Sequence, residues 1–396
     1  MAHILAREFT VICAIAFATL AFVACDPKML GSDETSHAAT IKATPTPNDE
    51  NSITIAAVGD IMLGSTSINN SFLPPNDGRD ILKPMMPYLT DADITFGNLE
   101  GPMLEGGTSA KCAPPTSSKP GQEPSPAATP KPAGTPKPVR CYAFRVPTRY
   151  GKYLKEAGFD VMSLANNHAG DFGEYGRNST RKVLDGLGIK YAGAGRAGSS
   201  TTILEVKGKK IAFVGFAHNN IVPNLNDLET AKQLVIAAKK KADLVVVSFH
   251  GGAEGEAAQH VPKETEIFVG EKRGNVYAFA HAVIDAGADL VLGHGPHVNR
   301  AMEIYKGHLI DYSMGNFCTY GMFSLNGAQS LAAVFHFTIG LDGKFITGKI
   351  IPAKQEGRGG PIPDSSGSVI AKIQSLSSAD FPTTSPKIAD DGTISY

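Results

Sequence analysis

The chain has 396 residues, and 42% of them are hydrophobic, which is enough for one large α/β domain or two smaller ones with an ample core. Its formal net charge is −1, whereas nucleic-acid-binding proteins usually have a strongly basic balance. We therefore expect a globular protein without a nucleic-acid partner.

The first 25 residues have the features of an export signal. Arg7 precedes an apolar segment, Phe9 to Ala24, which ends in a small residue directly before Cys25. A Cys in that place resembles a bacterial lipoprotein signal, which implies that Cys25 is lipidated and anchors the mature protein to the cell membrane. Phe22 stands where that pattern usually has Leu, so two alternatives stay open. One is ordinary signal cleavage, giving a periplasmic or secreted protein, and the other is an uncleaved anchor.

Two polar stretches are expected to lack regular structure. Residues 26–52, rich in Ser, Thr, Pro and Asp, indicate a flexible tether. Residues 105–141 hold a Pro-rich insertion in which Thr-Pro-Lys-Pro occurs twice. Cys112 and Cys141 flank the densest part of it, and an exported protein permits disulfides. We expect these two cysteines to close the insertion at its base; two unrelated free thiols are the alternative.

Short apolar runs alternate with helix-like segments from residue 53 to about residue 351. The expected strands are Ile53–Val58, Asp93–Phe96, Val161–Leu164, Tyr191–Ala194, Ile211–Phe216, Leu244–Phe249, Leu290–Leu292, Met302–Tyr305, Leu309–Tyr312, Leu331–Ile339 and Phe345–Ile351. The expected helices are Tyr150–Ala157, Tyr175–Gly186, Leu228–Lys241 and Val276–Ala286. This alternation predicts βαβ units and a largely parallel sheet in the first 300 residues.

Later strands come in pairs joined by the turn dipeptides Lys306-Gly307 and Asp342-Gly343, which indicates an antiparallel portion. We therefore predict one α/β domain over residues 53–352, with two packed sheets flanked by helices. Residues 353–396, rich in Gly, Ser and Pro, are predicted to form an irregular tail.

Five expected strands end in polar residues suited to a metal ion or a reacting group. These residues are Asp60; Asn98 and Glu100; Asn166, Asn167, His168 and Asp171; His250; and His294 with His297. Because ligands in open α/β sheets bind beyond the carboxyl ends of the strands, we expect these side chains to converge. Asn316 and the run His218-Asn219-Asn220 also follow strand ends and could line the same site, or only form turns.

Mixed nitrogen and oxygen ligands suit Zn, Mn or Fe better than Ca, and the cysteine placement excludes a thiolate site. Taken singly, Asp60 or Asn98 would be an ordinary cap or turn residue. A metal-free, purely structural network of buried His and Asn is the alternative to a metal centre.

Several of these segments together resemble one family. The segments are Gly59-Asp60-Ile61-Met62-Leu63-Gly64, Gly97-Asn98-Leu99-Glu100-Gly101, Ala165-Asn166-Asn167-His168 with Asp171, Gly293-His294-Gly295-Pro296-His297 and Tyr312-Ser313-Met314-Gly315-Asn316-Phe317. They resemble the CapA family of capsule-synthesis proteins, which is associated with poly-γ-glutamate capsules, over about residues 53 to 352. The resemblance implies a calcineurin-like metallophosphoesterase fold, a four-layer αββα sandwich of the metallo-dependent phosphatase type.

The resemblance implies metal ligands at Asn167, His250 and His294, and a general acid at His168 that protonates a leaving oxygen. The half of the site around Asp60, called the first half-site below, departs from the metallophosphoesterase pattern. Metallophosphoesterases have Asp-x-His on this first strand, but here Asp60 is followed by Ile and Met. Asn98 stands where an Asp would bridge two metals, and the nearest carboxylate belongs to Glu100.

A neutral Asn is a poor bridge between two cations, so we expect one divalent metal, or a weak second one. Asp60, Asn98, Glu100 and His297 complete the expected ligand set. Glu100 or Asp60 would orient the attacking water. Asn166, Asp171 and Asn316 are expected to contact substrate.

Two functions compete. One is metal-assisted hydrolysis or transfer at a phosphoester or amide bond. The other is a non-catalytic, polymer-binding accessory of a capsule-synthesis complex anchored in the envelope. Both imply an acidic cell-surface polymer such as poly-γ-glutamate, or other capsule-synthesis subunits, as partners.

Overall fold

The computed structural model describes residues 51–112, 141–195 and 200–396. The predicted signal, the lipidation of Cys25 and nearly all of the predicted tether fall outside these residues, as does the insertion between Cys112 and Cys141. In the described part of the chain, no helix is both long and apolar enough to cross a membrane.

The first sheet is built around a long central strand, β1 (Ser52–Met62). Three strands follow it in parallel on one side: β2 (Ile94–Leu99), β3 (Val161–Ser163) and β4 (Lys190–Ala192). On the other side β14 (Leu331–Gly340) and β15 (Phe345–Gln355) pair antiparallel. Shorter strands complete the sheet: β13 (Asn316–Thr319), β16 (Pro361–Pro363), β17 (Lys387–Ile388) and β18 (Thr393–Ser395).

The second sheet has the order β11-β12-β10-β7-β6-β5. Its strands are β5 (Thr201–Val206), β6 (Lys209–Ala217), β7 (Leu244–His250), β10 (Leu290–His294), β11 (Met302–Tyr305) and β12 (His308–Asp311). β6, β7 and β10 run parallel, as the alternating pattern predicts, and β12 pairs parallel with β10 as well. Both expected hairpins are present, since β11 pairs antiparallel with β12 and β14 with β15. A separate hairpin joins β8 (Glu266–Phe268) and β9 (Glu271–Gly274).

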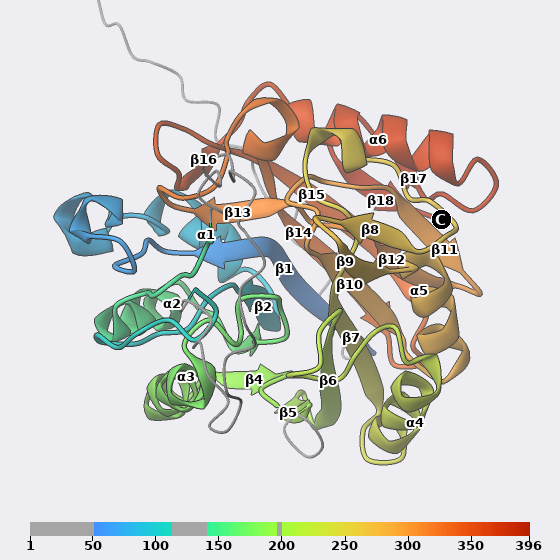
Figure 1. The fold of residues 1–396 in the computed structure, drawn as a ribbon. Helices are drawn as coiled ribbons and strands as arrows, with labels where there is room; N and C mark the ends of the chain where they lie inside the picture. Colours follow the sequence, from blue (N-terminus) through green and yellow to red (C-terminus); the bar gives the residue numbers. More distant parts are fainter. Residues whose placement is uncertain (1–50, 113–140, 196–199) are drawn as a thin grey trace, which may run out of the picture. The chain divides into compact units, whose positions relative to one another are not determined.

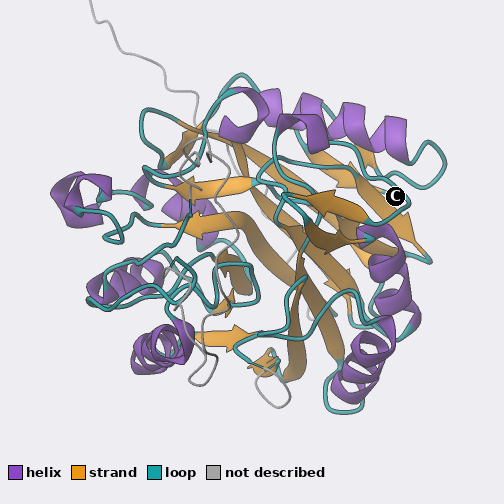
Figure 2. Ribbon diagram, in the orientation of Figure 1, coloured by secondary structure: helices purple, strands orange, loops and turns teal. Residues whose placement is uncertain are grey.

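The two sheets pack face to face with helices outside (Figures 1 and 2). Along β1, alternate residues such as Ile53 and Ile55 enter the core between the sheets, where they meet Phe213 and Leu290. A strand buried on both faces is a continuous apolar run, which is why β1 was recognisable.

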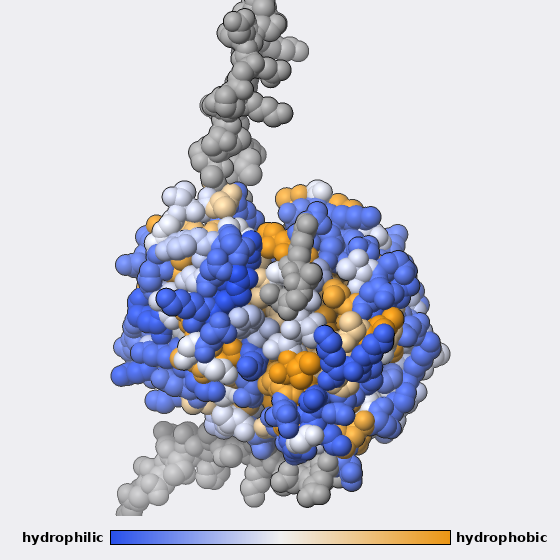
Figure 3. Space-filling view, turned by 90° about the horizontal axis from the view of Figure 1, so that it is seen from below, coloured by the Kyte–Doolittle hydropathy of each residue, from blue (hydrophilic) through white to orange (hydrophobic). Residues whose placement is uncertain are grey.

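The other face of the first sheet is covered by α1 (Met86–Leu89), α2 (Gly151–Glu156) and α3 (Gly173–Leu187). The outer face of the second sheet is covered by α4 (Leu228–Lys239) and α5 (Val276–Asp285). These layers form the expected αββα sandwich. Short 3-10 turns are Asn70–Phe72, Pro75–Gly78, Lys83–Met85, Thr148–Tyr150, Glu256–Ala258 and Gly327–Ser330. On the face shown in Figure 3, hydrophilic side chains predominate and apolar ones form small separate patches.

The prediction of an irregular tail over residues 353–396 is wrong. The segment carries α6 (Ser368–Asp380) together with β16, β17 and β18. Val369, Ile370 and Ile373 on α6 are buried in the core between the sheets. Their spacing is that of one helix face, and burial of that face outweighs the Gly, Ser and Pro around it.

Candidate metal centre

Polar side chains from both sheets meet where the strands end. Asp60 and Asn98 are paired in register on β1 and β2, and His250 and His294 are paired on β7 and β10. The Nδ2 of Asn98 lies 3.4 Å from Nδ1 of His250, and Nδ1 of His294 lies 3.3 Å from Oδ1 of Asp60. Parallel strands of two packed sheets thus bring residues from four strands into one buried cluster.

The Asp60 carboxylate is the hub of this cluster. It accepts a hydrogen bond from Nδ2 of Asn98 at 2.8 Å and contacts Nδ1 of His297 at 2.9 Å. Burial alone would raise the pKa of Asp60, but the nearby imidazole rings of His294 and His297 outweigh it and hold that pKa well below its usual value. Asp60 is therefore ionised in the folded protein.

His297 lies between the carboxylates of Asp60 and Glu100. Its Nε2 lies 3.8 Å from Oε1 of Glu100, opposite the ring nitrogen that meets Asp60. Burial opposes the charge, yet the carboxylates of Glu100 and Asp60 raise the pKa of His297 to about 10. Its backbone has φ 59°, a left-handed conformation that is uncommon outside glycine and that concentrates at functional sites.

Several buried nitrogen and oxygen atoms that could bind a metal ion have no hydrogen-bond partner. Within the described residues, both carboxylate oxygens of Glu100, Nε2 of His250 and both ring nitrogens of His294 have no hydrogen-bond partner. Oδ1 of Asn167, which directly precedes His168 in the chain, has none either. Burial raises the pKa of Glu100 and lowers that of His250, both well away from their usual values. Unpaired buried polar atoms are costly, so a set of them is the expected signature of a ligand that completes the site.

The donor chemistry fits a divalent transition metal. One ligand atom each from Asp60, Glu100 and His297 lie within 4.8 Å of one another. Within this triad, the carboxylate of Asp60 also accepts the hydrogen bond from Asn98. The paired His250 and His294 add imidazole nitrogens without partners among the described residues.

An acid–base pair flanks the cluster. Nδ1 of His168 lies 2.7 Å from Oδ2 of Asp171, and Nε2 of His168 lies 3.8 Å from Oε1 of Glu100. The Asp171 carboxylate also accepts the backbone N–H of Phe144 at 2.7 Å and an ion pair from Lys111 at 3.5 Å. Burial lowers the pKa of His168, and the charge of Asp171 opposes that shift.

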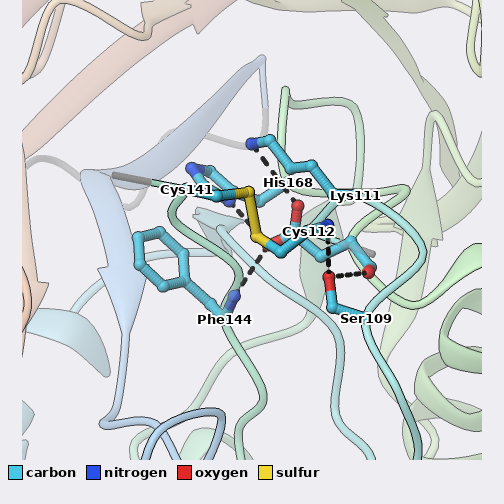
Figure 4. The surroundings of a disulfide bond; sticks show 7 residues. Ser109, Lys111, Cys112, Cys141, Phe144 and His168 are labelled. Carbon is cyan, nitrogen blue, oxygen red and sulfur yellow. Dashed lines mark hydrogen bonds and ion pairs between the residues drawn. A yellow bond between two sulfur atoms is a disulfide. The ribbon is translucent and has the colours of Figure 1, made fainter. Parts of the chain in front are cut away.

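The insertion's base supports this pair. Cys112 and Cys141 form a disulfide, as the sequence predicted, with an S–S distance of 2.03 Å. Lys111, Phe144 and His168 gather around that bond in Figure 4. The Phe144 ring stacks on the His168 ring with centroids 4.0 Å apart. The disulfide therefore joins the segment of Lys111, which pairs with Asp171, to the segment of Phe144, which contacts both Asp171 and His168.

Residues 54–320 match the family described as "Bacterial capsule synthesis protein PGA_cap". The chain belongs to this family. It is 30% identical over 295 residues to "Capsule biosynthesis protein CapA" of Bacillus anthracis, covering 69% of this chain and 61% of that protein. It is 34% identical over 181 residues to "PGA biosynthesis protein CapA" of Bacillus subtilis (strain 168), covering 42% and 44%. The chain thus spans less than two thirds of either relative.

A solved structure of a "Putative 5'-Nucleotidase from Staphylococcus aureus in complex with alpha-ketoglutarate" overlaps 80% of this chain and 55% of its own. The sequence identity is 13% and the TM-score 0.39.

The residues expected to contact substrate have intramolecular partners. Asn166 donates to Oδ1 of Asn98 at 3.2 Å and to the Leu99 carbonyl at 2.9 Å. Oδ1 of Asn316 lies 3.1 Å from Nδ1 of His297. These contacts, with that of Asp171 to His168, orient neighbouring members of the site, and substrate contact by any of the three stays a prediction.

Sequence reasoning missed Glu254, whose Oε2 lies 3.9 Å from Nε2 of His297. Arg273 holds the other carboxylate oxygen of Glu254 at 2.7 Å. Buried Arg300 donates to the carbonyls of Ala253 and Ala258 and so fixes the loop that carries Glu254. The signal that could have found Glu254 is its place four residues after the end of β7, at the edge where the ligands gather.

His218 follows a strand end and is one of the residues that the sequence suggests for the lining of the site. Its Nδ1 lies 3.3 Å from the carbonyl of His250, and its Nε2 lies 3.4 Å from the Glu271 carboxylate. Asn219 donates to the backbone carbonyl of Asn166 at 2.9 Å. The residues after β6 therefore contact the end of β7 at His250 and the loop that carries Asn166.

Proposed function

We propose that this protein is a metal-dependent hydrolase of the cell envelope that acts on a phosphoester or amide bond during capsule-polymer biosynthesis. The printed names of the two Bacillus relatives, capsule biosynthesis and PGA biosynthesis, support that pathway. Because the chain spans only part of each relative, both the activity and an acidic polymer substrate such as poly-γ-glutamate belong to the proposal.

The observation that carries the proposal is the set of buried, unpaired donors on Glu100, His250, His294 and Asn167. His250 and His294, with Asn167 and the carboxylates of Asp60 and Glu100, would hold a divalent ion such as Zn, Mn or Fe. A bound ion of this kind lowers the pKa of a water toward 7 and polarises the bond to be cleaved.

His168 is the proposed general acid. The contact of Nδ1 with Asp171 fixes the imidazole plane and leaves Nε2 facing Glu100, on the side of the cluster. Burial lowers the pKa of His168, and the charge of Asp171 offsets part of that shift. His168 can then hold a proton at Nε2 and pass it to a leaving oxygen or nitrogen.

The altered first half-site favours a second candidate, a non-catalytic accessory that binds the polymer. Asn98 occupies the place where the resemblance implies an acidic bridge, and its Nδ2 donates to Asp60. Such an arrangement suits one ion better than two. In either case we propose export and lipid anchoring through Cys25.

Metal content and hydrolysis decide between these functions. We expect about one equivalent of transition metal in the purified chain by elemental analysis. His250→Ala and His294→Ala should lose it, whereas His336→Ala, which removes a buried histidine bonded to the Tyr88 carbonyl, should keep it. His168→Ala should keep the metal and lose hydrolysis of phosphoesters or γ-glutamyl amides.

An empty wild-type protein in excess Zn or Mn would refute the metal centre. A metal-loaded wild type that cleaves neither bond class would favour the accessory.

A further inference from the structure

A cavity lies beside the candidate metal centre. It has a volume of about 360 Å³, within the range of small-ligand sites. Its wall includes the disulfide, the loop residues Ser67 and Ile68, and Arg145.

One extended segment separates this cavity from the acid–base pair. Ala143 and Arg145 line the cavity, while Phe144 between them stacks on His168 and donates its N–H to Asp171. Phe172, the neighbour of Asp171, lines the cavity as well. A molecule bound there would lie one residue's width from the proposed general acid.

Arg145 is the one charged residue among those that line the cavity. Its guanidinium donates from Nε to Oγ1 of Thr66 at 2.9 Å, and from the two terminal nitrogens to the carbonyls of Gly107 and Thr66 at 2.8 and 2.5 Å. All three acceptors are neutral, and within the described residues Arg145 makes no ion pair with a carboxylate. No carboxylate among the described residues therefore balances its positive charge, and its Cζ lies 5.5 Å from the centroid of the Phe172 ring, a cation–π contact.

The guanidinium is also preorganised. Three of its five N–H groups are used to fix its position, which leaves one N–H on each terminal nitrogen. A side chain already held in one conformation loses little entropy when it binds, and two adjacent N–H groups suit a carboxylate. The rest of the wall is partly apolar, with Ile68, Phe172 and Met322.

We propose that this cavity is a substrate subsite in which Arg145 binds an anionic group, a carboxylate on an aliphatic chain, beside the general acid. The chemistry matches one unit of an acidic polymer, with the carboxylate on Arg145 and the methylene groups against the apolar wall. The inference rests on the proposed function for its substrate, but its test measures binding and not turnover.

The experiment titrates a fluorescent γ-linked glutamate oligomer into the full chain and follows fluorescence anisotropy, as purified and again with chelator. Arg145→Gln should weaken binding about tenfold or more, because hydrogen bonds to a charged group are lost. The matched control is Arg149→Gln, which removes an exposed arginine paired with Asp77 outside the cavity, and it should bind as wild type does.

A second variant keeps the guanidinium and its supporting hydrogen bonds. Ile68 lines the cavity and is 65% exposed, so Ile68→Glu should fold and place a competing carboxylate before Arg145. It should weaken oligomer binding to a similar degree, whereas Ile346→Glu, at a position 50% exposed on β15, should not.

Equal binding by wild type, Arg145→Gln and Ile68→Glu would overturn the subsite, as would no binding by the wild type. Competition by inorganic phosphate as strong as by the oligomer would overturn the carboxylate assignment. Binding that persists with chelator while hydrolysis is absent would refute the proposed activity and support the subsite.

Discussion

Replacing Asp171 with Asn tests the acid–base pair with almost no change in shape. Oδ2 of Asp171 meets Nδ1 of His168 and the N–H of Phe144, both at 2.7 Å. An amide oxygen can keep both contacts but without the charge, which costs about 1 kcal/mol for each hydrogen bond. Lys111 is 35% exposed along its side chain, so its ion pair adds at most about 1 kcal/mol. We expect a loss of about 2–3 kcal/mol in the free energy of unfolding.

The chain offers a matched control for this substitution. Asp380 contacts Nδ1 of His260 at 2.6 Å and accepts the N–H of Val261 at 2.9 Å, but the His260 side chain is 68% exposed. Asp380→Asn should therefore cost less than about 1 kcal/mol.

Guanidinium unfolding followed by circular dichroism measures both variants. Hydrolysis should fall roughly tenfold or more in Asp171→Asn alone, because a positioned acid is worth that much or more. The reasoning fails if Asp171→Asn is as stable as Asp380→Asn and hydrolyses substrate at the wild-type rate.

Three further predictions concern a buried carboxylate, the disulfide and the N-terminal cysteine. Burial alone would raise the pKa of Glu303, but bonds to His281 and Tyr312 outweigh it and lower that pKa below 4.5. The wild type should therefore have a higher free energy of unfolding than Glu303→Gln, by an amount that is constant above about pH 5 and shrinks at lower pH. Denaturant unfolding at several pH values measures this difference. A difference that grows on acidification would contradict the prediction. Non-reduced peptide mapping should find Cys112 joined to Cys141, and replacing both with Ser should cost about 3 kcal/mol; two alkylatable thiols in the wild type would refute the bridge. Labelled palmitate should enter the wild type and not Cys25→Ser, and equal labelling of both would exclude that anchor.

The positions of the main strands along the chain and the gathering of their polar ends could be predicted because both depend on local patterns. β1, β7 and β10 are continuous apolar runs, and the residue that ends or follows such a run must lie at the sheet edge. The positions of Asp60, His250 and His294 thus follow from chain geometry.

What escaped prediction depends on contacts between distant segments. Glu254 lies in a glycine-rich loop without periodicity, and contacts of Arg273 with Glu254 and of Arg300 with Ala253 help to hold it near His297. The segment that forms β13 resembles a turn in the sequence. Its partner in the sheet, β1, is more than two hundred residues away, so no local pattern reveals that the two pair.

The inward contacts of Asn166 and Asn316 could not be foreseen either. An amide side chain at a strand end can face solvent or the protein with equal local cost. The neighbours Asn98 and His297 decide which way it points.

The disulfide fixes the two ends of the proline-rich stretch 5.6 Å apart, measured between Cα atoms. Because the disulfide holds these two ends together, the geometry around His168 should not depend on the length or composition of residues 113–140. Residues 113–140 can accordingly be trimmed, or exchanged for an affinity tag or a spectroscopic label. Cys112 and Cys141 would stay joined, so the rest of the domain would keep the same contacts with them.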